Sequence, residues 1–245
     1  MKLPERRFDA AGNLVVTLDA RGHTGSAESV AARWLAERGA SVRFDILAVL
    51  TGGAAIRADF WNPDGSREPF CGNALRCVSR VLVPAPRGEI VVDTAFSRCT
   101  SGHAPGGWGR VSIPAAVVRI AAEGGDFVVD PGTPHRVRIL DALEGDDCEG
   151  PGHAWSAGCE PDARINATFV QRVPHGARVR TFERGVGETG SCGTGAIAAV
   201  AVLEFRNGRV LWPGARTMVF RSGHRLRVTH DGGMLTLSGR CKLLG

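Results

Sequence analysis

A loop that ends in cysteine, glycine and a small polar residue, where a helix should begin, occurs twice in this chain. The first loop ends at Cys71-Gly72-Asn73 and the second at Cys192-Gly193-Thr194, about half a chain length further on. At a helix N-terminus, the backbone N–H groups and the helix dipole favour a negative charge, so each thiol occupies a position that stabilises its thiolate. The repeat predicts two similar halves, each supplying one reactive thiol.

The composition is that of an ordinary globular protein with room for two domains. Of the 245 residues, 43% are hydrophobic and 22% are charged, and a chain of this length buries a substantial core. The net charge of +5 comes from arginines scattered along the sequence rather than gathered in one patch. We therefore expect no nucleic-acid partner, whereas a preference for small anionic ligands is compatible with the charge.

The termini and the cysteines indicate a reducing compartment and no membrane. Residues 1–7 contain no apolar segment typical of a secretory signal, and the longest apolar run, residues 196–203, is too short to span a bilayer. Seven cysteines at irregular spacings, without a C-x-x-C pair, predict neither a disulfide framework nor a metal site. We expect a cytoplasmic protein. The cysteines outside the two loops are interpreted as small buried hydrophobes: Cys77, Cys99, Cys148, Cys159 and Cys241.

The hydrophobic patterning predicts many strands and few helices. Helices are expected at residues 27–38, with Ser26 as N-cap, and at 73–83 and 194–205. Strands are expected at residues 8–19, 42–50, 55–61, 90–94, 111–113, 117–120, 127–129, 165–173, 179–182, 217–221, 226–230 and 234–237.

This order predicts an α+β fold of two pseudo-symmetric domains, each a mostly antiparallel sheet wrapped around a main helix. We expect one domain over residues 1–112, joined by the C-terminal strand at about 234–245, and the other over residues 113–233. The active site is expected in the cleft between them.

The second loop also contains a literal G-x-G-x-x-G over residues 185–190, which raises dinucleotide binding as an alternative function. The predicted helix, however, begins only after Cys192, beyond the last of these glycines. No parallel βαβ unit surrounds the segment, and no acidic residue ends a second strand about twenty residues on. The motif alone is weak support for a nucleotide site.

The residues around the two cysteines resemble the signature motifs of the diaminopimelate epimerase family, a group of cofactor-independent amino-acid epimerases and racemases. The matching segments are residues 62–66 with 71–77, and residues 183–195. Further matches, in family order, are Gly12-Asn13, Pro134-His135 and Asn166. The resemblance extends over nearly the whole chain.

This resemblance implies an isomerase that uses no pyridoxal phosphate and no other cofactor. One cysteine, as thiolate, would remove the α-proton of an amino acid from one face, while the other, as thiol, would protonate the opposite face. The roles of Cys71 and Cys192 would reverse for the other enantiomer. Amides at the two helix N-termini would hold the substrate carboxylate as negative charge develops on it.

The resemblance also implies a set of substrate contacts, in which Glu183 would bind an ammonium and Arg184 a carboxylate. Outside the motif, that pair would be interpreted as solvated surface residues, and the asparagines as turn or strand-end residues. His135 is open to a structural or a site-lining role. The implied substrate-binding residues are Asn13, Asn62, Gly72, Asn73, Asn166, Glu183, Arg184, Gly193 and Thr194.

Departures from the family pattern leave the substrate open. Thr133 stands where the family has asparagine, Ile46 stands where it has glutamine, and residues 238–245 match poorly. The substrate is therefore either LL-diaminopimelate or another α-amino acid of specialised metabolism, such as a histidine-like or hydroxylated one. A non-catalytic amino-acid-binding relative is the alternative from another class, although binding alone needs no thiols. A homodimer is the default expectation for the assembly.

Overall fold

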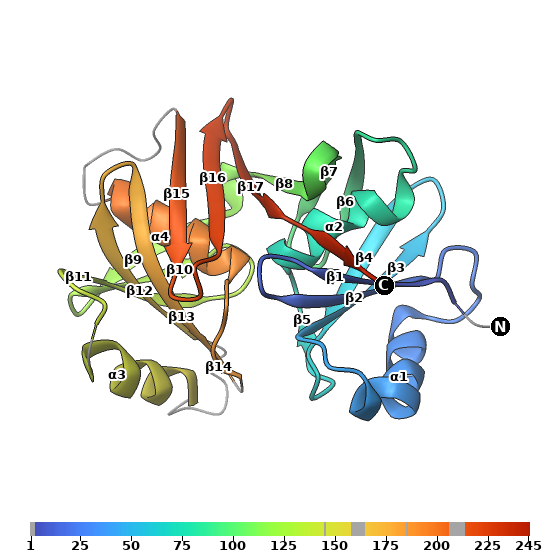
Figure 1. Ribbon diagram of the computed structural model, residues 1–245, viewed down its shortest axis with the longest axis horizontal. Coiled ribbons are helices and arrows are strands. Elements are labelled where there is room, and N and C mark those ends of the chain that lie inside the picture. The colour runs from blue at the N-terminus through green and yellow to red at the C-terminus, as the bar shows by residue number, and fades with distance from the viewer. Residues whose placement is uncertain (1–2, 145, 158–164, 185, 206–213) are drawn as a thin grey trace. The chain divides into compact units, whose positions relative to one another are not determined.

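A computed structural model of the chain describes residues 3–144, 146–157, 165–184, 186–205 and 214–245. The chain divides into two compact units (Figure 1). The N-terminal unit comprises Met1–Ile113 and Ser238–Gly245, and the C-terminal unit comprises Pro114–Leu237. Each unit contains its own set of paired strands and its own central helix, and the chain leaves the first unit once and returns to it at its end.

The sheet of the N-terminal unit has the order β18-β1-β2-β3-β4-β6-β7-β8, with the short β5 also paired to β4. The β2–β3 and β4–β6 pairs are parallel, and the others are antiparallel. The elements are α1 (Ala27–Arg38), α2 (Gly72–Leu82), β1 (Glu5–Asp9), β2 (Leu14–Asp19), β3 (Ile46–Gly52), β4 (Ile56–Trp61), β5 (Arg67–Glu68), β6 (Gly88–Asp93), β7 (Arg98–Ala104), β8 (Trp108–Pro114) and β18 (Lys242–Leu244), with 3-10 turns at Gly39–Ser41 and Pro105–Gly107.

The sheet of the C-terminal unit has the order β9-β10-β11-β12-β13-β15-β16, with the short β14 also paired to β13. Here β11–β12 and β13–β15 are the parallel pairs. The elements are α3 (Asp146–Ala157), α4 (Gly193–Phe205), β9 (Arg119–Glu123), β10 (Asp126–Asp130), β11 (His135–Leu140), β12 (Asn166–Val173), β13 (Gly176–Glu183), β14 (Gly187–Glu188), β15 (Gly214–Phe220) and β16 (Arg225–Asp231), with a 3-10 turn at Ala115–Val117. Strand β17 (Met234–Arg240) begins in this unit and ends in the N-terminal one.

The two units repeat the same sequence of elements, which confirms the predicted α+β fold of two similar halves. In each, a first parallel pair is connected through an outer helix, α1 or α3, and a second through a central helix, α2 or α4. Parallel strands need such crossover connections, because a tight turn only joins antiparallel neighbours. The cysteine loops precede α2 and α4, so they occupy equivalent positions in the repeat.

The central helices are the most buried elements of the units. Residues 72–79 of α2 and 193–200 of α4 are buried on every side, as expected of a helix enclosed by a curved sheet. The outer helices cover the opposite sheet faces through aromatic contacts. Trp34 of α1 meets Phe44 edge to face with ring centroids 5.2 Å apart, and Trp155 of α3 stacks on Phe169 at 5.4 Å.

One predicted strand, residues 8–19, is wrong, because the chain turns in its middle and forms β1 and β2. Ala11 and Gly12 have φ angles of 60° and 85°, and the Gly12 N–H donates to Asp9 Oδ1 at 2.6 Å. A left-handed pair closed by an aspartate is a turn and not a strand. Asn13 is the last residue of this turn and directly precedes β2.

No helix in the described ranges has both the length and the apolar character needed to cross a membrane.

Candidate functional site

Cys71 and Cys192 cap their helices in the same way. The backbone N–H of Ala74, three residues on, donates to Cys71 Sγ at 3.4 Å, and that of Gly195 donates to Cys192 Sγ at 3.3 Å. The N–H groups of Leu75 and Ala196 donate to the carbonyls of the two cysteines, which closes the first helical turn. Each sulfur thus occupies an N-cap position and accepts a backbone hydrogen bond that favours its anionic form.

The two residues after each cysteine lie in the first turn of a helix, where backbone N–H groups have no acceptor within the helix. These are Gly72 and Asn73 in α2 and Gly193 and Thr194 in α4. Each helix start therefore combines a sulfur with two amide donors. Such a constellation suits an anionic group close to a thiol.

In the N-terminal unit, the structure connects the start of α2 with the β1–β2 turn. Arg76 donates to Asn73 Oδ1 at 2.8 Å and to the Ala10 carbonyl at 3.1 Å. Asn13 follows this turn; its side chain is buried, and its Oδ1 has no hydrogen-bond partner among the described residues. A buried amide oxygen without a donor is unfavourable in the unliganded protein and suits a ligand N–H or ammonium.

The other two sequence-predicted residues of this unit lie in different settings. Ile46 begins β3 and is buried opposite Val15 of β2. The Asn62 amide donates to Ser66 Oγ at 3.0 Å and to Glu68 Oε1 at 2.9 Å. The Asn62 side-chain nitrogen is therefore committed to its own hairpin in this structure.

In the C-terminal unit, a chain of hydrogen bonds leads from the sheet to the Cys192 sulfur. His135 Nε2 lies 2.9 Å from Thr194 Oγ1, and His135 Nδ1 lies 2.8 Å from Thr168 Oγ1. Thr194 Oγ1 in turn lies 3.3 Å from Cys192 Sγ. His135 is fully buried, and its burial lowers its pKa to about 3, so the imidazole is neutral at neutral pH.

A neutral imidazole has one donor and one acceptor nitrogen, which gives this chain two self-consistent arrangements of hydrogen atoms. In one, His135 Nε2–H donates to Thr194, whose hydroxyl donates to a Cys192 thiolate. In the other, a Cys192 thiol donates to Thr194, whose hydroxyl donates to His135 Nε2. The buried relay satisfies both ionisation states of the sulfur without moving a heavy atom.

The depressed pKa of His135 predicts a specific pH dependence of stability. Between about pH 6.5, where an unfolded histidine titrates, and about pH 3, the unfolded state binds a proton that the folded state excludes. The free energy of unfolding should therefore fall by up to about 1.4 kcal/mol per pH unit on acidification through this window. Urea titrations should show that His135→Gln loses this share of the slope and that His175→Asn, at an exposed turn, keeps it. An unchanged slope in His135→Gln would contradict the account.

Glu183 ends β13, Arg184 follows it, and both are held by further residues. Thr189 Oγ1 donates to Glu183 Oε1 at 2.7 Å, and the Arg184 backbone N–H donates to Asn166 Oδ1 at 3.0 Å. Asn166 pairs with His135 across the parallel strands β11 and β12. The structure thus gathers these sequence-predicted residues with Thr194 and Cys192 at one end of the C-terminal unit, and Thr133 lies two residues before His135.

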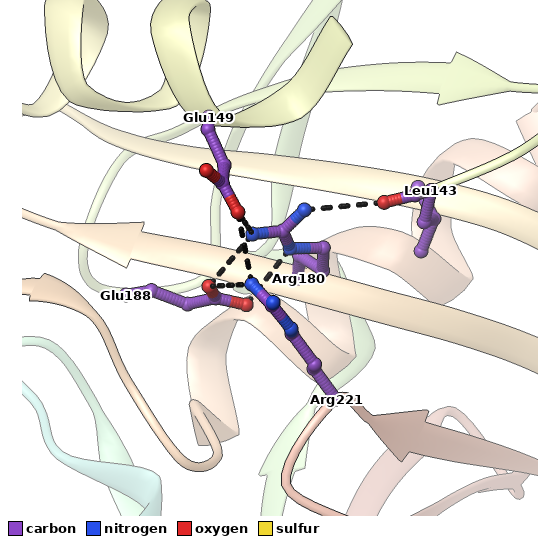
Figure 2. Close-up of polar contacts among 5 residues, drawn as sticks. All are labelled: Leu143, Glu149, Arg180, Glu188 and Arg221. Carbon is purple, nitrogen blue, oxygen red and sulfur yellow. Dashed lines mark hydrogen bonds and ion pairs between the residues drawn. The ribbon is translucent and has the colours of Figure 1, made fainter. Parts of the chain in front are cut away.

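The loop between β13 and α4 is anchored by a buried arginine (Figure 2). Arg180 Nε and Nη2 each donate to Glu188 at 2.8 Å, Nη2 donates to Glu149 at 3.0 Å, and Nη1 donates to the Leu143 carbonyl at 3.1 Å. Arg221 reaches the same two carboxylates from β15's end. Since Glu188 lies four residues before Cys192, this ion-pair network fixes the segment that leads to the sulfur.

Removing the Glu188 charge should loosen this anchor measurably. Glu188→Gln leaves the Arg180 guanidinium, only 4% exposed, without its bidentate partner, and hydrogen bonds to charged groups contribute about 1.5–3 kcal/mol. We expect the free energy of unfolding in urea to fall by about that amount. The matched control is Glu144→Gln, whose ion pair with Arg178 is solvent-exposed and should contribute little. Equal effects of the two variants would refute the anchoring role of Glu188.

Sequence reasoning missed the supporting residues Thr168, Thr181, Arg76 and Arg180. The threonines lie at inward positions of otherwise apolar strands, and that alternation was a usable signal. No local pattern marked the arginines, because their partners are distant in sequence. Cys159 lies outside the described residues. The cysteines of the described ranges are free thiols, and no group of His, Cys, Asp or Glu in these ranges could hold a metal ion.

Comparisons with known proteins find relatives that cover most of the chain. The family profile described as diaminopimelate epimerase matches residues 127–239. A diaminopimelate epimerase of Methanopyrus kandleri is 31% identical over 217 residues, covering 87% of this chain and 76% of the relative. One of Xanthomonas euvesicatoria is 32% identical over 259 residues, covering 89% and 91%. A solved hydroxyproline epimerase from Agrobacterium vitis with bound trans-4-OH-L-proline has a TM-score of 0.69 at 15% identity, covering 98% of this chain and 90% of that one, and shares the fold.

Proposed function

This chain belongs to the diaminopimelate epimerase family and is thus an isomerase, and we propose that it inverts the α-carbon of an amino acid without a cofactor, using Cys71 and Cys192 as two bases. The matched capping of the two sulfurs carries this proposal. Each thiol accepts an amide hydrogen bond at a helix start, and the two positions are equivalent in the repeat. Inversion needs one group on each face of the stereocentre, which is what two equivalent thiols supply.

The chemical difficulty is the weak acidity of the α-hydrogen. Deprotonation places negative charge on the α-carbon and its carboxylate, so catalysis depends on donors that stabilise this charge in the transition state. The first-turn amides of α2 and α4 are such donors. Losing one donor of this kind typically costs about 3 kcal/mol of transition-state stabilisation.

The thiols must exchange roles for the enzyme to act on both enantiomers. A sulfur that starts as thiolate and ends as thiol needs surroundings that suit both states. The Thr194–His135–Thr168 relay supports this for Cys192, because its hydrogen atoms can rearrange as the sulfur gains or loses its proton. His135 itself stays neutral throughout.

Two substrate classes fit the remaining groups, LL-diaminopimelate and another α-amino acid. Glu183 and Arg184 carry opposite charges next to each other, which suits a substrate with a second zwitterionic or polar end. Thr133 and Ile46 replace the amide side chains of the family pattern by a hydroxyl and an apolar side chain, which favours a different distal group. The reaction at the α-carbon is the same for both classes.

The experiment is a screen of single enantiomers in deuterium oxide. The panel includes LL-diaminopimelate, proline, 4-hydroxyproline, histidine and hydroxylated amino acids, and the readouts are chiral chromatography and α-deuterium by mass spectrometry. We expect inversion accompanied by deuterium at the α-carbon for at least one class. Binding of an amino acid by calorimetry, with no α-deuterium across the panel, would instead support a non-catalytic amino-acid-binding protein.

A further inference from the structure

The N-terminal unit buries one arginine with no carboxylate partner. Arg76 lies on α2, five residues after Cys71, and is fully buried. Its donors reach the Arg240 carbonyl at 3.1 Å, the Ala10 carbonyl at 3.1 Å, Asn73 Oδ1 at 2.8 Å and Cys241 Sγ at 3.5 Å. Its Nε has no hydrogen-bond partner. Among the residues that the structure describes, Arg76 forms no ion pair with an aspartate or glutamate.

Among the residues that the structure describes, Arg180 is the other deeply buried arginine, and its charge is compensated. Arg180 is paired with Glu188 and Glu149, as expected because an unpaired charge in a protein interior is strongly unfavourable. Carbonyls and an amide satisfy hydrogen bonds of Arg76, but they do not neutralise its charge. A buried charge without a carboxylate partner, on the helix that Cys71 caps, points to an electrostatic role.

We propose that Arg76 is a positioning residue that orients the Asn73 side chain and places a positive charge behind the first turn of α2, where it stabilises the Cys71 thiolate and the carboxylate of a bound substrate. The inference rests on the proposed function in assigning Cys71 as a base. Residues five apart on a helix are about 7.5 Å apart along its axis. A charge buried within the first two turns of the helix that a sulfur caps shifts the titration of that sulfur appreciably.

Cys241 accepts a hydrogen bond from Arg76 and can become its counter-ion. A hydrogen bond from the Cys77 thiol, together with the charges of Arg76 and Arg80, lowers the pKa of Cys241 to about 7 against its burial. Burial raises the pKa of Cys77, which therefore stays protonated. A partly ionised Cys241 would offset part of the field of Arg76.

The other titratable groups on elements packed around α2 are already engaged. Asp9 of β1 accepts from the Gly12 N–H, and His103 of β7 bonds to Ser79 and the Ala85 carbonyl. The acidic side chains of β2 and β6 pair with nearby arginines, Asp19 with Arg21, Glu89 with Arg110 and Asp93 with Arg98.

The test measures the alkylation of Cys71 by iodoacetamide as a function of pH, without substrate, and follows the Cys71 peptide by mass spectrometry. In Arg76→Met, the pH of half-maximal alkylation should rise by about one unit. Arg76→Lys should restore most of the shift. The matched control is Arg80→Met, one turn later on α2, which should leave the midpoint within about 0.3 units because its charge is closer to solvent.

Cys241→Ser provides a second test, in which the alkylation midpoint of Cys71 should not rise. It removes the counter-charge and retains Arg76, so the Cys71 midpoint should fall or stay constant. A folded Arg76→Met protein with the wild-type midpoint would overturn the proposal. If Arg76→Met does not fold, a rise in the midpoint of Cys241→Ser overturns it. Because no substrate is used, a shifted midpoint in a protein that inverts no amino acid would refute the proposed function and leave this inference standing.

Discussion

Replacing either Cys71 or Cys192 with serine should reduce the rate of α-carbon inversion by roughly 10²–10⁴-fold, the usual contribution of a positioned acid or base. A serine hydroxyl is a far weaker acid than a thiol, so the variant keeps the shape of the site but loses one proton-transfer group. Chiral chromatography of the product from a single enantiomer measures the loss.

The two variants should also differ from each other in a way that a structural defect would not produce. With one thiol left, only the enantiomer whose α-hydrogen faces that thiol can exchange it with solvent, and the proton returns to the same face. Each variant should therefore exchange deuterium into one enantiomer without inverting it, and the two variants should prefer opposite enantiomers.

Cys99→Ala is the matched control for this pair. Burial raises the pKa of the Cys99 thiol to about 12, so this sulfur is not a candidate base, and the variant should invert the substrate at close to the wild-type rate. A serine variant of Cys71 or Cys192 that racemises at a near-normal rate would refute the two-base mechanism.

The second large effect is expected at Gly195, where α4 passes very close to the sheet. A Cβ at this position would stand 2.7 Å from Thr181 Oγ1 and 3.4 Å from Cys192 Sγ. Gly195→Ala must therefore displace the Thr181 hydroxyl, the cysteine or the helix start. Because misplacing a catalytic group by about 1 Å can reduce the rate about 10²-fold, we expect a loss of that size in kcat.

Gly150→Ala on α3 is the control for Gly195→Ala. A Cβ at Gly150 meets no atom within 4 Å outside its own helix and chain neighbours. This variant should keep full activity. Full activity in Gly195→Ala would show that the position of the Cys192 sulfur tolerates a shift, contrary to the proposed geometry.

The parts of the fold that sequence reasoning predicted are those governed by local signals. The N-cap of α1 is confirmed, since Ser26 Oγ accepts the Ser29 N–H at 3.2 Å. The starts of α2 and α4 follow their cysteine loops within one residue of the prediction. Capping and periodicity involve neighbours in sequence, so they can be predicted without the tertiary structure.

Helix α3 was not predicted, because its sequence contradicts helix propensity. Gly150, Pro151 and Gly152 interrupt it, and such residues usually end a helix. Packing explains the exception. A Cβ at Gly152 would stand 2.6 Å from the Phe182 ring, so glycine is what allows α3 to approach β13 closely. Long-range contact outweighs local preference here, which a single sequence does not reveal.

The residues of the candidate site likewise fall into those that local motifs reveal and those that only the folded structure brings together. The cysteines, Glu183 and Arg184 were identified because they lie in compact motifs. The groups that hold them, such as Arg76 with its partner at Arg240 or His135 with Thr194, meet only in the folded unit. Their roles depend on burial and on distances that no spacing in the sequence encodes.

The central claim, two thiols acting on opposite faces of one stereocentre, is tested most directly by the isotopic composition of the first product formed. A single enantiomer of the substrate is incubated in deuterium oxide, and the reaction is stopped within the first few per cent of conversion. The product and the remaining substrate are then separated, and the deuterium content of each is determined by mass spectrometry. The account predicts that the product carries deuterium at its α-carbon while the remaining substrate is still protiated. Early product that retains the original α-hydrogen would mean that a single base carries the proton across, and would contradict the account.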